Sequence, residues 1–340
     1  MTLELRPSPA RGGRASRIAW FGRAGQGLVR AAPVVVAVAV LVVLAVRTPA
    51  ILGLANLQAS ITQAAPIAVV AMGLVLVIAA GGDDVVSGGI DLSLAATATL
   101  STAILAKAMT ERGLSFGVAL ALVGAVALGL GLVNAGLVVI VGMTPILATL
   151  ASLVVISGLI RVVTKNRRTD TPQPVIAAIR DGQLLGLPLA AVLALALMAV
   201  LWLAVQRTAF GAHLRAAGAG RSAAVTAGLN PNRYLAAAFV IASLTAGFDG
   251  LLLAARGSGF SPGTEERLLV DMVLAGYLSP VFSRRGVATP PGALVAALLV
   301  ALLTNALVLS RVDNSWVYGF KGALILTVVA VSSITARRSR

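Results

Sequence analysis

Apolar stretches close to the length of a membrane-spanning helix recur along almost the whole chain, separated by short segments with charge, proline or glycine. An α-helix needs about 20 residues to cross the hydrocarbon core of a bilayer. The pattern therefore predicts an all-α, polytopic membrane protein with about ten transmembrane helices. The expected spans are residues 31–48, 62–80, 90–109, 116–141, 144–163, 186–206, 234–255, 265–283, 288–309 and 315–334.

Composition supports this fold class. Hydrophobic residues make up 58% of the chain and charged residues 11%, and the mean hydropathy is +0.96, whereas soluble domains are about 45–50% apolar. The first apolar run is too long for a secretory signal and no small-residue cleavage site follows it, so we interpret it as a retained helix. We expect one transmembrane domain at 31–335, between a basic segment at 1–30 and a basic tail at 336–340.

The net charge of +15 lies mainly beside the predicted spans. If the amino terminus is cytoplasmic, ten spans place the segment 207–233, the turn at Arg284 and Arg285 and the carboxyl terminus on the cytoplasmic side, as the positive-inside rule requires. The segment 164–185 is the exception, because the same threading places it outside. Its basic residues are Lys165, Arg167, Arg168 and Arg180.

Other kinds of site find little support in the composition. The basic residues have no interleaved aromatic side chains on which bases stack, so we expect no nucleic-acid partner. The chain has no cysteine and a single histidine, His213, which argues against disulfides, thiolate metal sites and histidine-rich metal sites. No Gly-x-x-x-x-Gly-Lys-Ser/Thr motif occurs, so the chain lacks the loop that cradles ATP phosphates.

A glycine-rich acidic segment, GGDDVVSGGIDLS at 81–93, interrupts the apolar pattern between the second and third spans. Irregular backbone at membrane depth needs water or protein partners for its polar groups. One interpretation is a mouth or hinge beside a conduction path, formed by Gly88, Gly89, Asp91 and Ser93. The alternative is an ordinary capped loop between two helices.

The segment 207–233 carries four arginines and no acidic residue. Ala223, Ala224 and Val225 give a short helix an apolar side between Gly220 and Gly228, and such a helix fits a partner's groove. The alternative is a positive-inside loop at the lipid headgroups. Asn230 and Pro231 then end the segment and start the next span.

Polar side chains inside the predicted spans are few and therefore informative, because each is expensive in lipid and tends to face the bundle interior. They are Gln63, Asn134, Asp249, Asp271, Asn305 and Lys321. The neutral ones either join helices by hydrogen bonds or line a path. Asp249 contacts a substrate hydroxyl or pairs with Lys321, whereas Asp271 is also compatible with a solvated surface beside Glu265 and Glu266. Glycines such as Gly129, Gly131, Gly136, Gly247 and Gly250 are expected to pack helices together.

Several blocks together resemble the ribose-type permeases of bacterial ABC importers. They are GGIDLS at 88–93, preceded by Asn56, Gln58, Ala65 and AMGLVLVIAAGG at 71–82, then GLVNAGLVV at 131–139, TPILATL at 144–150, LLGLPLAAVLAL at 184–195 and the segment 207–233. The resemblance extends from about residue 54 to the end. Three features depart from it: the longer break at 81–93, Ala95 in place of a glycine, and the segment 276–293, which replaces a glycine-rich turn.

The resemblance implies a multi-pass permease subunit of the bacterial inner membrane, with both termini cytoplasmic, which imports a monosaccharide or similar polyol. The implied contacts with a partner ATPase are Arg215, Gly218, Gly220, Arg221, Ala223, Ala224, Gly228 and Asn230. The path or gate residues that we expect, from the break and from the polar positions inside the spans, are Gly88, Gly89, Asp91, Ser93, Gln63, Asn134, Asp249 and Asn305. The scarcity of charge inside the spans agrees with an uncharged cargo.

The implied partners are the ATPase subunit, an external solute-binding protein, a second permease copy or close paralogue, and membrane lipid. The chain itself is expected to bind no cofactor, since its partner uses the ATP and magnesium. The alternative function is an ion-coupled secondary transporter, with Asp249, Asp271 and Lys321 as coupling groups. An intramembrane enzyme is disfavoured, because no span combines a nucleophile with a base or carries a pair of metal ligands.

Overall fold

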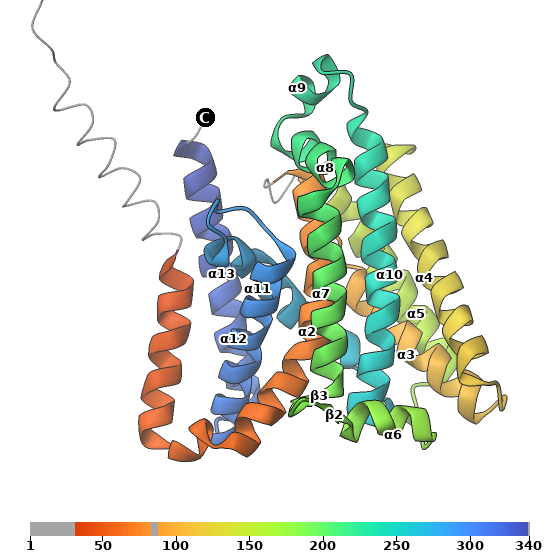
Figure 1. The fold of residues 1–340 in the computed structure, drawn as a ribbon, viewed down its shortest axis with the longest axis vertical. Coiled ribbons are helices and arrows are strands. Elements are labelled where there is room, and N and C mark those ends of the chain that lie inside the picture. The colour runs from red at the N-terminus through yellow and green to blue at the C-terminus, as the bar shows by residue number, and fades with distance from the viewer. Residues whose placement is uncertain (1–30, 83–87, 339–340) are drawn as a thin grey trace, which may run out of the picture.

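The computed structural model describes residues 31–82 and 88–338 and forms a bundle of long helices (Figure 1). Each of the ten predicted spans appears as a helix. They are helix Ala31–Arg47, α2 (Leu54–Gly81), α3 (Leu94–Thr110), α4 (Phe116–Val139), α5 (Pro145–Thr164), α7 (Leu189–Arg207), α10 (Pro231–Gly257), α11 (Thr264–Leu278), α12 (Pro290–Leu309) and α13 (Asn314–Arg338). The predicted all-α membrane fold is confirmed. The basic segment at 1–30 lies outside the described residues.

Six of the described helices are long and apolar enough to cross a membrane, by length and composition: α2, α4, α5, α7, α10 and α12. Shorter elements connect the helices. They are the 3-10 helices Pro49–Leu52 and Ser279–Phe282, the helices α6 (Pro174–Asp181), α8 (Ala209–Ala219) and α9 (Arg221–Thr226), and the strands β1 (Thr169–Asp170), β2 (Gln183–Leu184), β3 (Leu187–Pro188) and β4 (Gly259–Phe260). Strand β1 pairs antiparallel with β4, and β2 with β3.

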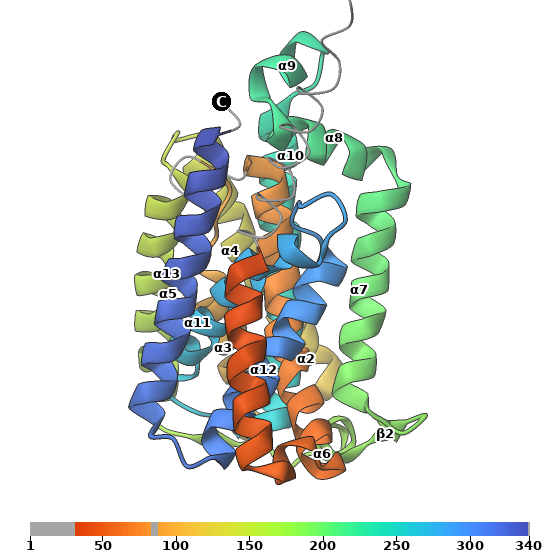
Figure 2. The same ribbon diagram turned by 90° about the vertical axis from the view of Figure 1, so that its left-hand side faces the viewer.

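The bundle has two distinct ends. We call the end with α8 and α9 the upper end, and the end with α6, β2 and β3 the lower end, as they are oriented in Figure 1. The start of helix Ala31–Arg47 and the end of α13 lie toward the upper end, as both views show (Figures 1 and 2). The segment 164–185 lies at the lower end. This arrangement follows the order that the threading of ten spans predicts.

Helix α2 forms the centre of the bundle. Its apolar stretch is 89% buried, whereas those of α4 and α5 are each 22% buried. It packs most extensively against α12 and α10 and also contacts α7, α8 and α11. The helix begins at Leu54, earlier than the predicted start at residue 62. Asn56 and Gln58 weakened the apolar pattern there, but the Asn56 amide donates to the carbonyl of Ile51 and stabilises the extra turns.

Small residues let α10 approach α3 and α4 closely. A Cβ atom on Gly250 would lie 2.5 Å from Cβ of Ser101 on α3, and one on Gly247 would lie 2.6 Å from Cβ of Ala127 on α4. Gly131 of α4 is similarly close to α10. By contrast, a Cβ atom on Gly129 or Gly136 would meet nothing within 4 Å. The predicted packing role is therefore confirmed for three of the five glycines and wrong for these two within this chain.

We predict that Gly250→Val destabilises the bundle by about 1–3 kcal/mol, because the added carbons force α10 away from α3. Gly129→Val is the matched control, since it adds the same side chain to an open helix surface. The measurement is the thermal unfolding midpoint of the purified protein in detergent, followed by size-exclusion chromatography. Equal midpoints for the two variants would show that the close contact of α10 with α3 contributes nothing.

Candidate functional site

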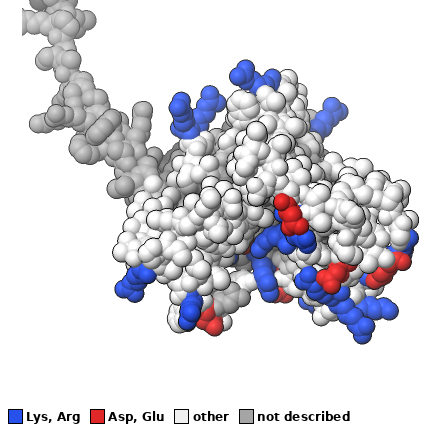
Figure 3. Space-filling view, turned by 60° about the horizontal axis from the view of Figure 1, so that its bottom comes forward, with Lys and Arg blue, Asp and Glu red and all other residues white. Residues whose placement is uncertain are grey.

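A cavity of about 470 Å³ lies in the lower half of the bundle, within the range of about 300–1,000 Å³ typical of small-molecule sites. Its walls come from α2, α3, α12 and α13, and from the end of α10, strand β4 and the start of α11. The polar lining includes Gln63, Thr99, Thr102, Thr304, Asn305 and Lys321. Basic side chains border a hollow near the middle of this end of the molecule (Figure 3). The cavity therefore combines hydroxyl and amide groups with fixed charge.

An ion pair joins α11 to α13 in the cavity wall. Lys321 Nζ lies 2.6 Å from Asp271 Oδ1, and the two residues are only 5% and 7% exposed. The predicted pairing of Lys321 with Asp249 is therefore wrong, and so is the interpretation of Asp271 as part of a solvated surface. The reason is the path of α11, which turns from the lower end back into the bundle and places Asp271 against α13.

Asn305 connects α12 to the central helix while it also faces the cavity. Its amide nitrogen donates to Ser60 Oγ at 2.9 Å, and Ser60 Oγ donates to the carbonyl of Asn56 at 2.8 Å. Gln63, one turn further along α2, lines the same cavity. Asn305 therefore fills both roles that were considered for neutral polar residues: it joins two helices and it lines a polar space.

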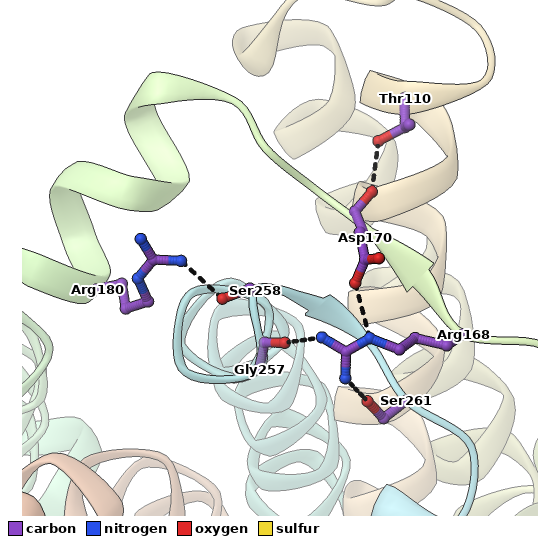
Figure 4. Close-up of polar contacts among 7 residues, drawn as sticks. All are labelled: Thr110, Arg168, Asp170, Arg180, Gly257, Ser258 and Ser261. Atoms are coloured by element: carbon purple, nitrogen blue, oxygen red, sulfur yellow. Dashed lines mark hydrogen bonds and ion pairs between the residues drawn. The ribbon is translucent and has the colours of Figure 1, made fainter.

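The rim of the cavity is held by arginines from the segment between α5 and α7 (Figure 4). Arg168 donates from Nε to Asp170 Oδ1 at 2.7 Å, from Nη1 to Ser261 Oγ at 3.0 Å and from Nη2 to the Gly257 carbonyl at 2.9 Å. Arg180 donates to Ser258 Oγ at 2.7 Å. Hydrogen bonds from Arg180 hold the pKa of the adjacent Asp181 below its ordinary value. These bonds fix the turn that connects α10 to α11.

A second polar group lies at the start of α3, away from the cavity lining. Asp91 Oδ1 accepts from the backbone N–H of Ser93 at 2.9 Å and from Ser93 Oγ at 2.6 Å. Ser93 Oγ accepts from Asn134 Nδ2 at 2.8 Å, and Asn134 Oδ1 accepts from Ser152 Oγ at 2.5 Å. The chain of bonds ties α3, α4 and α5 together. Three predicted path residues, Asp91, Ser93 and Asn134, thus meet in one buried network.

The predicted break enters the bundle rather than crossing its surface. Gly88 and Gly89 are buried, and a Cβ atom on Gly89 would collide with the carbonyl oxygen of Val77 on α2. Only glycine allows the backbone to approach α2 this closely. Residues 83–87, in the middle of the break, lie outside the described residues. The described part, 88–93, is therefore more deeply buried than an ordinary surface loop.

Asp249 stands apart from both groups. It is fully buried at 0% exposure on α10, and neither carboxylate oxygen has a hydrogen-bond partner among the described residues. It precedes Leu253 and Arg256 on the same helix face, at a spacing of four and seven residues, and both of those residues line the cavity. Asp249 thus lies deeper in the bundle than the cavity, along the face of α10 that borders it.

The predicted partner segment folds into two short helices, α8 and α9, at the upper end. Gly218 packs so closely on the end of α2 that a Cβ atom there would collide with the Ala79 carbonyl. Arg215 donates to the Val205 carbonyl, and Arg221 donates to Asn232. The short helix α9 projects beyond the bundle (Figures 1 and 2).

The residues of α9 divide between those that stabilise the segment and those that face outward. Ala224 is buried within the segment, whereas Ala223 is exposed and Val225 is 58% exposed. Gly220 caps α9, Gly228 adopts a positive φ of 80°, and Asn230 caps α10 by accepting from the N–H of Asn232. The apolar side of α9 therefore presents Val225 rather than Ala224.

Two cavity residues escaped the sequence analysis. Arg256 and Arg267 both line the cavity. Arg256 directly follows the predicted span 234–255, and Arg267 lies near the start of the predicted span 265–283. The signal that identifies them is the short connection between α10 and α11, which brings the two helix ends together.

Comparison with known proteins also identifies permeases. Residues 56–329 match the family described as branched-chain amino acid transport system / permease component. The probable ABC transporter permease protein y4mJ of Sinorhizobium fredii is 30% identical over 93% of this chain and 94% of its own. The galactofuranose transporter permease protein YtfT of Escherichia coli is 29% identical over 80% and 78%. The L-arabinose ABC transporter permease protein AraH of Azospirillum brasilense is 27% identical over 96% and 91%.

The resemblance that the sequence motifs predicted is thereby confirmed. No solved structure is significantly similar to this chain.

We predict that removing one partner of the Lys321–Asp271 pair destabilises the protein by about 3 kcal/mol, because the other charge is left buried without its counter-ion. The variants are Asp271→Leu and Lys321→Met, alone and together, and the measurement is the thermal unfolding midpoint in detergent. The double variant is expected to recover most of the loss. Asp181→Leu is the control, since its exposed pair with Arg180 contributes little. A double variant no more stable than the weaker single one would contradict the coupling.

Proposed function

Because this chain belongs to the branched-chain amino acid transport system / permease component family, we propose that it is the permease subunit of an ABC importer for a monosaccharide or similar polyol in the bacterial inner membrane. The observation that carries the proposal is the position of α2. At its lower half this helix lines the polar cavity with Gln63 and Ile67, and at its upper end it contacts α8. One buried helix therefore connects a solute-sized cavity to the basic segment.

The cargo class rests on the relatives and on the cavity. The family description names branched-chain amino acids, but the relatives with a named cargo transport galactofuranose or L-arabinose. A branched-chain amino acid needs an apolar pocket for its side chain. Besides apolar side chains, the cavity presents Gln63, Asn305 and four threonines, which suit the hydroxyl groups of a sugar.

Energy is supplied by a partner ATPase that docks on α8 and α9, and this chain itself binds no cofactor. The segment has an exposed apolar side chain, Val225, on a projecting helix, and its arginines lack acidic neighbours in the segment. Movement of α8 acts directly on α2 through the contact between Gly218 and Ala79. Since α2 packs against α10, α11 and α12, a tilt of α2 changes the walls of the cavity.

The remaining partners follow from this orientation. The upper end is cytoplasmic, with both termini on that side, and the lower end receives solute from an external binding protein. A second permease copy, identical or closely related, completes the path, and lipid surrounds α4 and α5, whose apolar stretches are mostly exposed. In this assembly the ATPase uses ATP and magnesium.

The alternative of an ion-coupled transporter is addressed by one observation. Its candidate coupling groups are separated, since Lys321 and Asp271 are paired with each other while Asp249 lies deeper without a partner. If it were correct, uptake would stop on addition of a protonophore and survive loss of the ATPase. The importer requires the reverse.

We predict that Val225→Asp abolishes stable binding of the ATPase, because it places a carboxylate in an apolar contact, and that Arg221→Glu weakens it at least tenfold. Leu185→Asp is the matched control, since Leu185 is 96% exposed at the opposite end. The measurements are copurification with co-expressed sugar-importer ATPases and ATP-dependent uptake of labelled sugar in proteoliposomes that also contain the binding protein.

Ala224→Asp would be a poor test, because Ala224 is buried within the segment and its replacement disturbs α9 itself. Unchanged ATPase binding and uptake in both Val225→Asp and Arg221→Glu would rule out α9 as the docking element. A loss of ATPase copurification in Leu185→Asp equal to that in Val225→Asp would show a general defect instead of a local one.

A further inference from the structure

Two arginines meet at the lower cavity from either side of the turn between α10 and α11. Arg256 lies in the last turn of α10, Arg267 in the first turn of α11, and both are solvent-exposed where they line the cavity. Neither makes an ion pair or side-chain hydrogen bond with any residue in the described ranges 31–82 and 88–338. Their charges repel each other. The fold thus holds two like charges together without a committed partner.

The other charges around the cavity do not neutralise this pair. Lys321 and Asp271 also line it, but they are bound to each other at 2.6 Å. Asp271 and, more weakly, Asp249 from deeper in the bundle also attract Arg256, although neither binds it directly. Glu265 and Glu266 of α11 lie outside the lining. Among the charged residues that line the cavity, three are basic and one, Asp271, is acidic. Since Lys321 is paired with Asp271, the two arginines supply the remaining positive charge, which a carboxylate in the cavity would offset.

We propose that the cargo is a sugar acid, a monosaccharide that carries one carboxylate. This inference rests on the proposed importer function and names its substrate class. The planar guanidinium groups of Arg256 and Arg267 bind the carboxylate through charge-assisted hydrogen bonds. The hydroxyl groups of the sugar meet Gln63, Asn305 and Thr304, which α2 and α12 contribute to the same cavity. This proposal departs from the uncharged cargo expected from the sequence, because Arg256 and Arg267 add positive charge to the cavity lining.

The turn that carries the arginines is built to hold their positions. Arg168 and Arg180 bind Gly257, Ser258 and Ser261, which lie directly between Arg256 and α11 (Figure 4). Strand β4 in the same turn pairs with β1. A fixed turn reduces the ordering cost when an anion binds, which is the advantage of a preorganised site.

The test measures binding to the full chain in lipid nanodiscs by saturation-transfer difference NMR. The probes are two matched pairs, glucose with glucuronate and galactose with galacturonate, so that each pair differs only in a carboxylate. Leucine, which has a carboxylate but no hydroxyl groups, is the fifth probe. We expect both acids to bind at least tenfold more tightly than their neutral sugars and more tightly than leucine.

Arg256→Gln and Arg267→Gln are expected to reduce the preference for the acid over its neutral sugar to less than about threefold. Arg256→Lys retains part of the preference, because it keeps the charge without the planar fork. Arg112→Gln is the control, since Arg112 is exposed at the turn after α3 and lies outside the cavity lining. It should match the wild type. Thermal midpoints verify folding, and Arg267→Gln provides the test if Arg256→Gln fails to fold.

Three outcomes would overturn the proposal: neutral sugars that bind as tightly as the acids, a preference for the acid that survives both glutamine variants, or leucine as the tightest ligand. ATP-dependent uptake in proteoliposomes separates this failure from that of the importer function. ATP-driven uptake of neutral sugars without preference for acids refutes only the cargo class. Acid binding without any ATP dependence of uptake refutes only the importer function. A third result is also informative: the wild type shows no preference for acids, and both glutamine variants lose uptake of neutral sugars. This result would assign the arginines to docking of the binding protein and would overturn the inference.

Discussion

A lipid bilayer offers no hydrogen-bond partner, so every polar group inside this bundle must find a partner in the chain or face water. The structure satisfies this constraint with a small number of bonds between helices. The chain from Ser152 through Asn134 and Ser93 to Asp91 joins three helices, and the Asn305–Ser60 bond joins α12 to α2. Arg256 and Arg267, which have no such bond among the described residues, line a cavity instead, whereas Asp249 is buried with neither a bond nor a place in the cavity lining.

The same constraint allows α2 to lie at the centre. Its apolar stretch contains no charged residue, so it can be buried on all sides without an unpaired charge. Absence of charge permits this position but does not decide it, because α4 is equally uncharged and exposes most of its apolar stretch. Its ends differ from its middle. Near one end it offers Asn56, Ser60 and Gln63 to polar contacts, and at the other Ala79 and the following glycines allow α8 and the 88–93 segment to pack against it. Because α2 is buried along its length and contacts different elements at its two ends, a displacement at one end can be transmitted to the other.

Much of this architecture was predictable, because the apolar pattern and the length of each run depend only on residues that are close in the sequence. All ten spans appear near the predicted positions, and α9 arises where the alanine pair between Gly220 and Gly228 indicated a short helix, whereas α8 was not predicted. Asp91 and Ser93 were singled out in the polar break and Asn134 as a polar residue within an apolar span. Buried polar groups need hydrogen-bond partners, and these three residues bond to one another. These inferences depended on sequence neighbours or on the high cost of a polar group in lipid.

What sequence reasoning missed depended on the packing of distant segments. Asp249 and Asp271 are equally conspicuous as acids in predicted spans, and nothing local decides which of them meets Lys321. The choice follows from α11, which packs along α13 and places Asp271 within 2.6 Å of the lysine. Likewise, Arg256 and Arg267 lie on different helices, and their convergence requires knowledge of how tightly the connecting turn folds.

The arginines of the segment 164–185 show how charge placement can serve two purposes. Judged as topological signals, they conflict with the positive-inside pattern, because they lie at the end opposite to 207–233. In the structure Arg168 and Arg180 instead donate to the carbonyl and hydroxyl groups at the end of α10, where a cation also opposes the negative end of the helix dipole. The turn held in this way carries Arg256 on one side and leads to Arg267 on the other. The exception to the charge rule is therefore explained by contacts at the cavity rim, and those contacts depend on the guanidinium fork rather than on charge alone.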